Sequence, residues 1–504
     1  MRQASGSDLG IHITSRRDCA AANRYCTKGL DQSSIAALQL TQIKDMPHML
    51  RIACGMDAAL LERYGGMVPR YTSYPTAPHF HAGVTGADYR VWLGGLTAKD
   101  HVSLYLHVPF CQSMCWYCGC HTKVVQKYQP IADYVALIKR ELGLVSAAIG
   151  ARPTISHVHF GGGTPNVLSP AHFRALMESI DAHFGWCEQA EIAVEIDPRS
   201  LTIPMVEAFA ETGVTRGSLG VQDFAPDVQA AINRLQPFEM TARAVDWLRE
   251  AGIAALNFDL MYGLPRQTVD GVLETVDRAV DLKPDRLALF GYAHVPWMKS
   301  HQRLIDPAAL PDRAARFAQA GEASRRLVAH GYHAIGLDHF ARPHDAMAQA
   351  LAGQRLHRNF QGYTSDQAST LIGFGASAIG ALTDGYVQNA VPFKAYGLAI
   401  EAGVLAVERG FRLSDDDRAR RAAIEALMCN LSVDLSAIER DFGQPPGCLS
   451  EATVQLAPMI SDGLVEVSGT KVRITERGRP FMRSVCTVLD HYLGRGAARH
   501  SQAV

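Results

Sequence analysis

The sequence lacks long apolar runs, and this absence narrows the class of protein. None of its 504 residues lies in an uninterrupted apolar stretch approaching the roughly 18 positions that a membrane-spanning helix needs. The first residues also lack the apolar core of a secretory signal. The net charge is only −1, so no excess of positive charge would attract nucleic acid or an anionic membrane. We therefore expect neither a membrane nor a nucleic-acid partner.

The sequence also lacks a disulfide framework. Of 11 cysteines, seven are scattered along the chain: Cys19, Cys26, Cys54, Cys187, Cys429, Cys448 and Cys486. Scattered cysteines are typical of a reducing compartment, so we expect a cytoplasmic protein. There is no internal repeat or low-complexity tract. A chain of 504 residues with 47% apolar residues predicts two or three domains and a large core.

The remaining four cysteines lie in one short loop. Cys111, Cys115 and Cys118 have the spacing C-x3-C-x2-C, and Cys120 follows two positions later. Three thiolates on a four-iron, four-sulfur cube leave one iron without a protein ligand, and that iron is open to chemistry. A structural zinc with Cys120 as fourth ligand is the alternative. Zinc sites usually join two knuckles from separate segments, whereas all four thiols here share one loop.

Apolar runs alternate with helical patterns from residue 103 to about residue 330. The predicted strands are 103–110, 155–162, 191–197, 216–224, 254–263 and 286–295. Amphipathic helices are predicted between them, for example over 131–150 and 170–184. Six units of this kind predict an α/β fold, an open (β/α)6 three-quarter TIM-like barrel, because eight units are needed for closure. Ligands of such barrels bind at the C-terminal ends of the strands, where the cysteine loop follows the first strand.

The rest of the chain divides around this barrel. Residues 1–55 show weak periodicity and are predicted to be a disordered or mis-assigned extension. Residues 411–490 contain three helical stretches and a hairpin with Ser468-Gly469-Thr470 at its turn, which predicts a mainly helical, winged-helix-like domain without a basic face. The predicted divisions are an N-terminal arm near the active site (56–100), the barrel (101–330), a segment completing the site (331–410), the C-terminal domain (411–490) and a flexible tail (491–504).

Polar residues recur at the ends of successive predicted strands. A Gly161-Gly162-Gly163-Thr164-Pro165 turn closes the second strand, and glycines expose backbone N–H groups to a ligand. Polar groups in apolar strands are costly to bury without partners, so the series predicts a ligand in the barrel mouth. The series contains Glu195 and Asp197 on the third strand, Gln222 and Asp223 on the fourth, Asp259 on the fifth, and Tyr292, Ala293 and His294 on the sixth.

The cysteine motif and the glycine turn resemble those of the radical S-adenosylmethionine (SAM) enzymes. In that superfamily SAM chelates the open iron, and an electron from the cluster releases a 5′-deoxyadenosyl radical. Longer segments resemble the oxygen-independent coproporphyrinogen III oxidase (coproporphyrinogen dehydrogenase) family, from about Leu61 to the C-terminal region. The alternative is a haem-binding trafficking protein of the same superfamily, whose motif lacks the C-x-C ending. The segments that resemble the oxidase family are 69–77, 106–120, 160–168, 194–199, 220–236, 259–268, 290–299, 336–343 and 356–364.

The resemblance implies a set of cofactor-binding residues. Cys111, Cys115 and Cys118 would ligate one [4Fe-4S] cluster, whose fourth iron SAM chelates. The positions implied for this first SAM are Tyr105, Gly162, Glu195 and Ile379. The positions implied for a second SAM are Tyr117, Gly163, Thr164, Gln222, Arg234, Asp259 and Ala293. The family often has Phe where this chain has Tyr117, and Cys120 receives no role.

The resemblance also implies an oxidoreductase reaction. Two propionates of coproporphyrinogen III would lose CO2 and become vinyl groups without oxygen, giving protoporphyrinogen IX for haem (porphyrin) biosynthesis. A saturated β-carbon has no acidic proton, so hydrogen-atom abstraction is needed instead of acid–base catalysis. An electron donor and a terminal electron acceptor are required, and the sequence identifies neither. A monomer is expected, and the candidate cations for the substrate carboxylates are Arg70, Lys299, Arg342 and Arg358.

Overall fold

The computed structural model of the protein describes residues 56–494. The chain divides into two units at Gly65, and the described part of the first is the helix α5 (Met56–Tyr64). The predictions for residues 1–55 and for the end of the C-terminal tail lie outside the described residues. Everything below concerns the second unit, from Gly66 onward. No described helix is long and apolar enough to cross a membrane.

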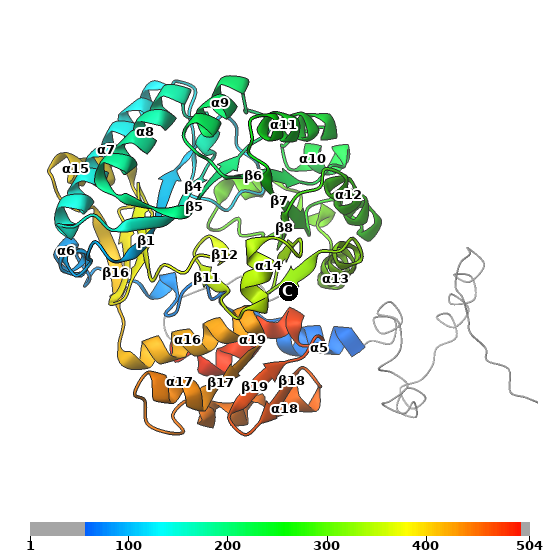
Figure 1. Cartoon of the computed structure of the whole chain (residues 1–504). Coiled ribbons are helices and arrows are strands. Elements are labelled where there is room, and N and C mark those ends of the chain that lie inside the picture. Colours follow the sequence, from blue (N-terminus) through cyan, green and yellow to red (C-terminus); the bar gives the residue numbers. More distant parts are fainter. Residues whose placement is uncertain (1–55, 495–504) are drawn as a thin grey trace, which may run out of the picture. The chain divides into compact units, whose positions relative to one another are not determined.

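Six parallel strands form the centre of this unit. They are β1 (His101–Val108), β4 (Thr154–Gly162), β5 (Gly185–Ile196), β6 (Arg216–Gln222), β7 (Ala255–Tyr262) and β8 (Arg286–Gly291), each paired with the next. Helices surround them on the outside (Figure 1). The helices are α7 (Gln129–Ile149), α8 (Pro170–His183), α9 (Ile203–Glu211), α10 (Pro226–Ala231), α11 (Phe238–Glu250), α12 (Val269–Asp281) and α13 (Arg313–Ala329). The predicted open α/β barrel is confirmed.

The sheet is longer than the six predicted strands. Beyond β1 it continues with β13 (Thr370–Phe374), β14 (Ile379–Leu382), β15 (Gly385–Asn389) and β16 (Val407–Arg412), and beyond β8 with β10 (His339–Ala341) and β9 (His333–Ile335). Of these, β13 pairs with β1 in parallel, although some 260 residues separate them. Sequence analysis predicts no strand in 331–410, because strands of three to six residues show too little alternation.

Alternation along the strands decides what each face of the barrel contains. In β7 the even-numbered Leu256, Phe258 and Leu260 are almost fully buried, and they belong to the main core with the surrounding helices. The odd-numbered Asn257 and Asp259 line a hollow inside the barrel instead. Because side chains alternate between the faces of a strand, the same sequence builds an apolar outer layer and a polar interior.

Short elements connect the barrel to the C-terminal part. After β10 come α14 (Ala346–Ala352) and a small hairpin of β11 (His357–Asn359) and β12 (Gly362–Thr364), and α15 (Phe393–Glu401) lies between β15 and β16. On the N-terminal side, α6 (Gly86–Gly94) precedes β1, and the two-stranded pair β2 (Phe110–Cys111) and β3 (Lys123–Val124) encloses the cysteine loop.

The C-terminal part has the predicted helices and hairpin. The helices are α16 (Asp415–Asn430), α17 (Leu435–Asp441) and α18 (Ala457–Ser461), followed by the hairpin of β18 (Val465–Ser468) and β19 (Lys471–Ile474). Its turn contains Gly469 at a φ of 61°, which favours glycine. A third strand, β17 (Ser432–Asp434), pairs with β19, and α19 (Met482–Cys486) follows the hairpin. The domain boundaries given above remain predictions.

A buried carboxylate holds the loop between β13 and β14. Glu141 of α7 accepts hydrogen bonds from Gly375 N (2.7 Å), Asn389 Nδ2 (2.6 Å) and the Tyr396 hydroxyl (2.7 Å). Tyr134, on the same helix, accepts from Ala376 N and donates to the His107 carbonyl of β1. These bonds tie the loop that precedes Ile379 to the first barrel strand.

We expect Glu141 to make stability depend on pH. Burial raises the pKa of this carboxyl from 4.5 to about 7. Between these values the folded protein retains a proton that the unfolded chain loses, so the free energy of unfolding should fall as pH rises, by about 3 kcal/mol at most. Melting temperatures of the cluster-free protein at pH 5.5 and 8 would measure this. Glu141→Gln should melt lower but lose this pH dependence; an unchanged dependence would contradict the assignment.

Candidate active site

The cysteine loop lies at the C-terminal end of β1. Cys115 is buried, Cys111 and Cys118 are half-buried, and Cys120 is exposed. The Thr122 hydroxyl lies 3.2 Å from Cys111 Sγ, and the Cys120 N–H donates to Cys118 Sγ at 3.4 Å. Sulfur atoms of the three predicted ligands therefore have polar groups close by, while Cys120 contributes its backbone to Cys118.

Two guanidinium groups meet at Cys115. Arg199 Nη2 lies 3.3 Å and Arg234 Nη1 3.5 Å from its sulfur. Both arginines pair with Asp197, at 2.6 and 3.4 Å. Burial would raise the pKa of Asp197, but the charge of Arg234 and the hydrogen bonds of Arg199 hold it below its usual value. Sequence analysis missed Arg199, although it stands two positions after Asp197 at the end of the third predicted strand.

The donor set of this loop fits an iron–sulfur cluster. In residues 56–494, no three His, Cys, Asp or Glu side chains are placed as ligands of a single metal ion. Cysteines that bind a four-iron cube each ligate a different iron, so they need not converge on one point. Hydrogen bonds to the sulfurs are a normal feature of such sites, and Arg199 and Arg234 are placed to supply them. The residues present therefore fit the cluster that the resemblance implies.

The glycine turn after β4 needs its glycines for close packing. Gly162 has a φ of 119°, and its N–H donates to Glu195 Oε2 at 3.0 Å. A Cβ on Gly161 would lie 2.7 Å from Glu195 Oε1, and one on Gly163 would lie 2.4 Å from the Phe110 carbonyl oxygen. Any side chain at these positions would displace either Glu195 or the backbone that leads into the cysteine loop.

Thr164, the next residue of this turn, is buried and accepts a hydrogen bond from Asp197 N at 3.1 Å. Asp197 in turn holds the two arginines that reach Cys115. The turn after β4, the end of β5 and the cysteine loop are thereby connected through a chain of hydrogen bonds. The structure brings Gly163 and Thr164, predicted to contact the second SAM, to the side of the cysteine loop.

The residues predicted for the first SAM share one part of the barrel. The Tyr105 hydroxyl lies 2.9 Å from His107 Nδ1, and its ring stacks on His159 at 5.9 Å. His159 Nε2 lies 3.1 Å from Glu195 Oε1. Burial would raise the pKa of Glu195, but the hydrogen bonds from His159 and Gly162 hold it below its usual value, and its side chain stays 37% exposed. Ile379 packs with Tyr105 in the same small apolar cluster.

Two residues predicted for the second SAM lie on the strands that come after β5: Gln222 on β6 and Asp259 on β7. The side chains of Gln222 and Arg234 both approach Gly220, where an added Cβ would lie 3.1 Å from Gln222 Nε2 and 3.0 Å from Arg234 Nη2. Asp259 Oδ1 accepts from Asn257 Nδ2 at 3.0 Å, and burial together with the charge of Glu195 raises the pKa of Asp259 to about 6. The carboxylate of Asp259 thus lies on β7, and the guanidinium of Arg234 comes from the segment between α10 and α11.

Tyr117 and Ala293 are the last two residues predicted for the second SAM. Tyr117 packs against an apolar cluster that contains Tyr292, the residue before Ala293, and its carbonyl accepts from Gln302 Nε2 at 2.9 Å. Asp223, in contrast, is 1% exposed and accepts a hydrogen bond from Gln267 Nε2 at 2.6 Å. Because its carboxylate is buried and already hydrogen-bonded, this member of the strand-end series has a structural role.

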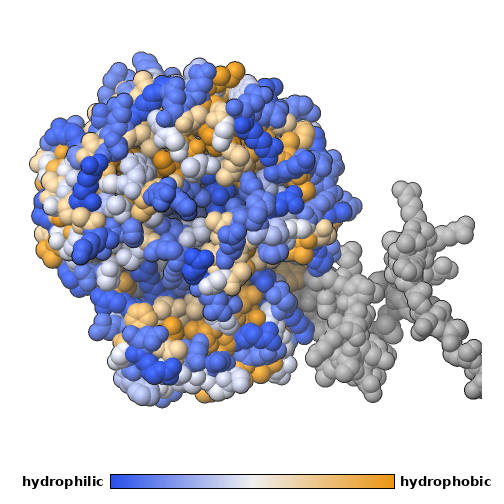
Figure 2. Space-filling model, viewed as in Figure 1, coloured by the Kyte–Doolittle hydropathy of each residue, from blue (hydrophilic) through white to orange (hydrophobic). Residues whose placement is uncertain are grey.

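A polar hollow occupies the barrel interior. Its empty space, part of it open to solvent, is about 910 Å³. In Figure 2 the face is hollowed over the ring of strands, and hydrophilic residues gather there. Glu195 and Asp259 line it together with polar residues that sequence analysis missed, although strand alternation marks them: Ser103, His157, His159, Glu191, Arg216, Ser218, Asn257, Arg286 and His339.

Ion pairs close the hollow at the N-terminal ends of the strands. Arg216 and Arg286, the first residues of β6 and β8, pair with Asp345 at 3.2 and 2.7 Å, and Arg216 also pairs with Glu191 at 3.1 Å. The carboxylates oppose the charges of the two arginines, although buried Arg216 Nη1 and Arg286 Nη2 have no hydrogen-bond partner in the described part of the chain. Ligand chemistry is thus directed to the opposite, C-terminal end, where the cysteine loop lies.

Comparison with known proteins places this geometry in context. The radical SAM superfamily matches residues 105–279, and the HemN C-terminal domain matches residues 413–481. The oxygen-independent coproporphyrinogen III oxidase of Bradyrhizobium diazoefficiens is 51% identical over 450 residues, covering 89% of this chain and all of that protein. The enzyme of the same name from Pseudomonas aeruginosa is 39% identical, over 87% of this chain and 96% of its own.

A solved structure is similar over the same range. The coproporphyrinogen III oxidase of Escherichia coli, described as a radical SAM enzyme, superimposes with a TM-score of 0.81 at 35% identity. The match covers 87% of this chain and 99% of that one. The likeness thus extends through the barrel into the C-terminal part.

Proposed function

The chain belongs to the oxygen-independent coproporphyrinogen III oxidase family, and from this premise we propose that it decarboxylates coproporphyrinogen III without oxygen. Two propionates become vinyl groups, and the product is protoporphyrinogen IX of haem biosynthesis. As a radical SAM enzyme it uses a [4Fe-4S] cluster and SAM. The observation that carries the proposal is the cysteine loop at the mouth of a polar barrel, in a chain that matches these relatives almost end to end.

The family assignment also decides between the alternatives. The relatives compared above bear the name of the oxidase, and none of those reported is a haem-trafficking protein. The C-x-C ending of the cysteine motif, Cys118-Gly119-Cys120, agrees with the oxidase pattern. The haem-trafficking hypothesis is therefore not favoured.

In the proposed site, Cys111, Cys115 and Cys118 ligate the cluster and leave one iron for SAM. When bound, cluster and SAM would supply a 5′-deoxyadenosyl radical for hydrogen-atom abstraction from a propionate side chain; loss of CO2, and of one electron to the electron acceptor, would then leave a vinyl group. The protein holds the participants: Glu195, fixed by His159 and Gly162, presents carboxylate oxygen beside Tyr105, and Ile379 presents an apolar surface. Arg199 and Arg234 donate hydrogen bonds toward Cys115.

We assign a second SAM to the residues on the following strands. Arg234 offers a cation for a carboxylate, and Asp259 offers an acceptor for hydroxyl groups. Gln222 lies beside Arg234, while Gly163 and Thr164 pack closely against the strand that leads into the cysteine loop. Arg234 supports this assignment because its buried Nε has no hydrogen-bond partner in the described part of the chain. Tyr117 and Ala293 complete the predicted set.

Product analysis tests the proposed reaction. Anaerobic protein with reconstituted cluster, SAM, a reductant, an electron acceptor and coproporphyrinogen III should release two CO2 per macrocycle and form 5′-deoxyadenosine and protoporphyrinogen IX. Chromatography of the oxidised porphyrins and of the nucleoside measures both. The matched control omits SAM. Turnover in that control, or haem binding without vinyl formation in the complete reaction, would overturn the proposal.

A further inference from the structure

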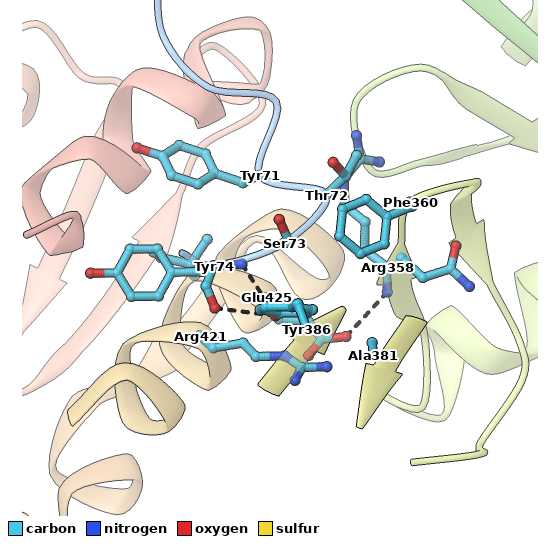
Figure 3. Close-up of a pocket in the computed structure, with 12 residues that line it drawn as sticks. Tyr71, Thr72, Ser73, Tyr74, Arg358, Phe360, Ala381, Tyr386, Arg421 and Glu425 are labelled. Atoms are coloured by element: carbon cyan, nitrogen blue, oxygen red, sulfur yellow. Dashed lines mark hydrogen bonds between the residues drawn. The ribbon is translucent and has the colours of Figure 1, made fainter. Parts of the chain in front are cut away.

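Two arginines from distant parts of the chain converge on the arm segment before Tyr71, which itself contains Arg70. Arg483 of α19 donates from Nε to the Pro69 carbonyl at 2.9 Å and from Nη2 to the Val68 carbonyl. Arg358 of β11 donates from Nη2 to the carbonyl of Arg70 at 3.5 Å. In Figure 3 the Arg358 side chain points toward the part of the arm that carries Thr72, while its backbone N–H donates to Glu425.

A fourth arginine approaches from the barrel side. The guanidinium of Arg316, on α13, lies 5.9 Å from the ring centre of Tyr262, the last residue of β7. Burial raises the pKa of Tyr262, and the charges of Arg316, Arg70 and Arg483 oppose that rise. We call Arg70, Arg316, Arg358 and Arg483 the arginine cluster.

The arginine cluster has too little negative charge around it. No ion pair joins Arg70, Arg316 or Arg358 to a carboxylate within residues 56–494. Buried nitrogen atoms of Arg316 (Nε) and Arg358 (Nε and Nη1) have no hydrogen-bond partner there either. Arg70 is exposed, whereas Arg316 and Arg358 are half-buried. Guanidinium nitrogens that are buried without a partner are costly, and like charges close together repel one another. Burial and the charges of Arg70 and Arg358 lower the pKa of Arg483 to about 10.

Asp338 is a carboxylate that interacts with the charges of Arg358 and Arg70. Burial would raise its pKa, but His339, at 2.7 Å, and the charges of Arg358 and Arg70 lower it to about 2. One carboxylate, already paired with a histidine, does not balance the charges of Arg70, Arg316 and Arg358. Arginine is the residue best suited to bind carboxylates, because its N–H groups match two oxygens at once.

The arginine cluster adjoins the candidate active site. Arg358 stacks on the ring of Tyr363 at 4.4 Å, and Tyr363 contacts His339 at 5.4 Å. Tyr363, His339 and Asn359 all line the polar hollow that also contains Glu195 and Asp259. Tyr262 ends β7, so the arginine cluster lies at the C-terminal ends of the strands, on the same side as the cysteine loop.

We propose that the arginine cluster binds the propionate carboxylates of the macrocycle that are not being decarboxylated. The proposal rests on the proposed function, because the substrate carries four such anions. A macrocycle held by two of them at this edge has its other two directed across the hollow toward Glu195 and Asp259. The same contact rejects macrocycles that lack carboxylates at this edge.

Lys299 and Arg342, the other two basic residues predicted to hold substrate carboxylates, lie outside the arginine cluster. Lys299 Nζ donates to the Cys120 carbonyl at 2.9 Å, so it supports the cysteine loop. Arg342 stacks on Tyr332 at 4.1 Å, and its N–H donates to the carbonyl of Asp285, the residue before β8. Arg342 is therefore at the N-terminal end of the strands, away from the cysteine loop, and it serves as a matched control for loss of an arginine.

Steady-state kinetics and porphyrin binding test the proposal. Arg358→Gln should raise KM for coproporphyrinogen III about tenfold or more with a smaller change in kcat, because one charge-assisted contact is lost. Arg358→Lys should recover part of the loss, and Arg342→Gln should behave like the wild type. SAM cleavage without substrate and the visible absorption of the cluster should stay unchanged in all three variants.

Binding of coproporphyrin III, the fluorescent oxidised macrocycle, gives a second readout. The wild type should bind the tetra-acid much more tightly than its tetramethyl ester, and Arg358→Gln should reduce that difference. If Arg358→Gln fails to hold its cluster, Arg70→Gln and Arg316→Gln decide the question. Wild-type turnover combined with unchanged KM and unchanged ester discrimination in the variants would overturn this inference alone. A wild type that forms no vinyl product would instead overturn the proposed function.

Discussion

Replacing Cys111, Cys115 or Cys118 with alanine should abolish both the broad visible absorption of the reconstituted cluster and all cleavage of SAM. The three thiols share one loop at the barrel mouth, and their sulfurs have hydrogen-bond donors around them. With two thiolates left, a second iron of the cube loses its protein ligand, and the cluster is not retained. Activity should fall below detection, because no other part of the site supplies an electron or a radical.

Cys120→Ala is the control for this experiment. Cys120 is exposed. Its N–H donates to Cys118 Sγ, its carbonyl accepts from Lys299, and its thiol is hydrogen-bonded to Cys118. Alanine preserves the two backbone contacts and removes only the thiol contact, so the variant should keep the iron content and absorption of the wild type. Iron and sulfide analysis next to the spectrum measures this. A Cys120 variant that cannot hold iron would show that the ligand set has been chosen wrongly.

Asp259→Ala should leave the cluster intact and lower turnover about tenfold to a hundredfold. Asp259 lines the hollow, and its nearest hydrogen-bond donor is the Asn257 amide. Removing a carboxylate that binds cofactor hydroxyl groups costs one or two charge-assisted hydrogen bonds. Iron content, absorption and steady-state production of protoporphyrinogen IX should be measured on the same preparation. Wild-type activity in this variant would remove Asp259 from the site.

The raised pKa of Asp259 gives this experiment a second readout. Burial and the charge of Glu195 place that pKa near 6, above its usual value. If the ionised carboxylate accepts the hydroxyl groups, turnover of the wild type should fall as pH drops through about 6, because protonation removes an acceptor. Asp259→Asn should have low turnover at every pH and lose this limb of the profile. An identical acidic limb in Asp259→Asn would assign the titration to another group.

Several features of this protein follow from local sequence. The C-x3-C-x2-C spacing sets the three thiols in one loop whatever surrounds them, because so few residues separate them. The glycine turn is equally local, since Gly162 adopts a positive φ that glycine tolerates. The six barrel strands are long enough for their alternation to be visible, and the structure has a strand at each predicted place. The resemblance to the family rests on the same short segments.

Other features could be decided only by the tertiary structure, because they join residues far apart in the chain. The short strand β13 becomes a parallel neighbour of β1 only when the intervening barrel has formed. Arg234 reaches Cys115 across 119 positions of the chain. Asp223 follows a strand as Asp197 does, but its side chain is buried and accepts a hydrogen bond from Gln267 instead. In Arg358 and Arg342 the sequence presents two similar basic residues. Arg358 stacks on Tyr363, which lines the polar hollow, whereas Arg342 stacks on Tyr332 near the N-terminal ends of the strands. This difference depends on which distant segments fold against each side chain.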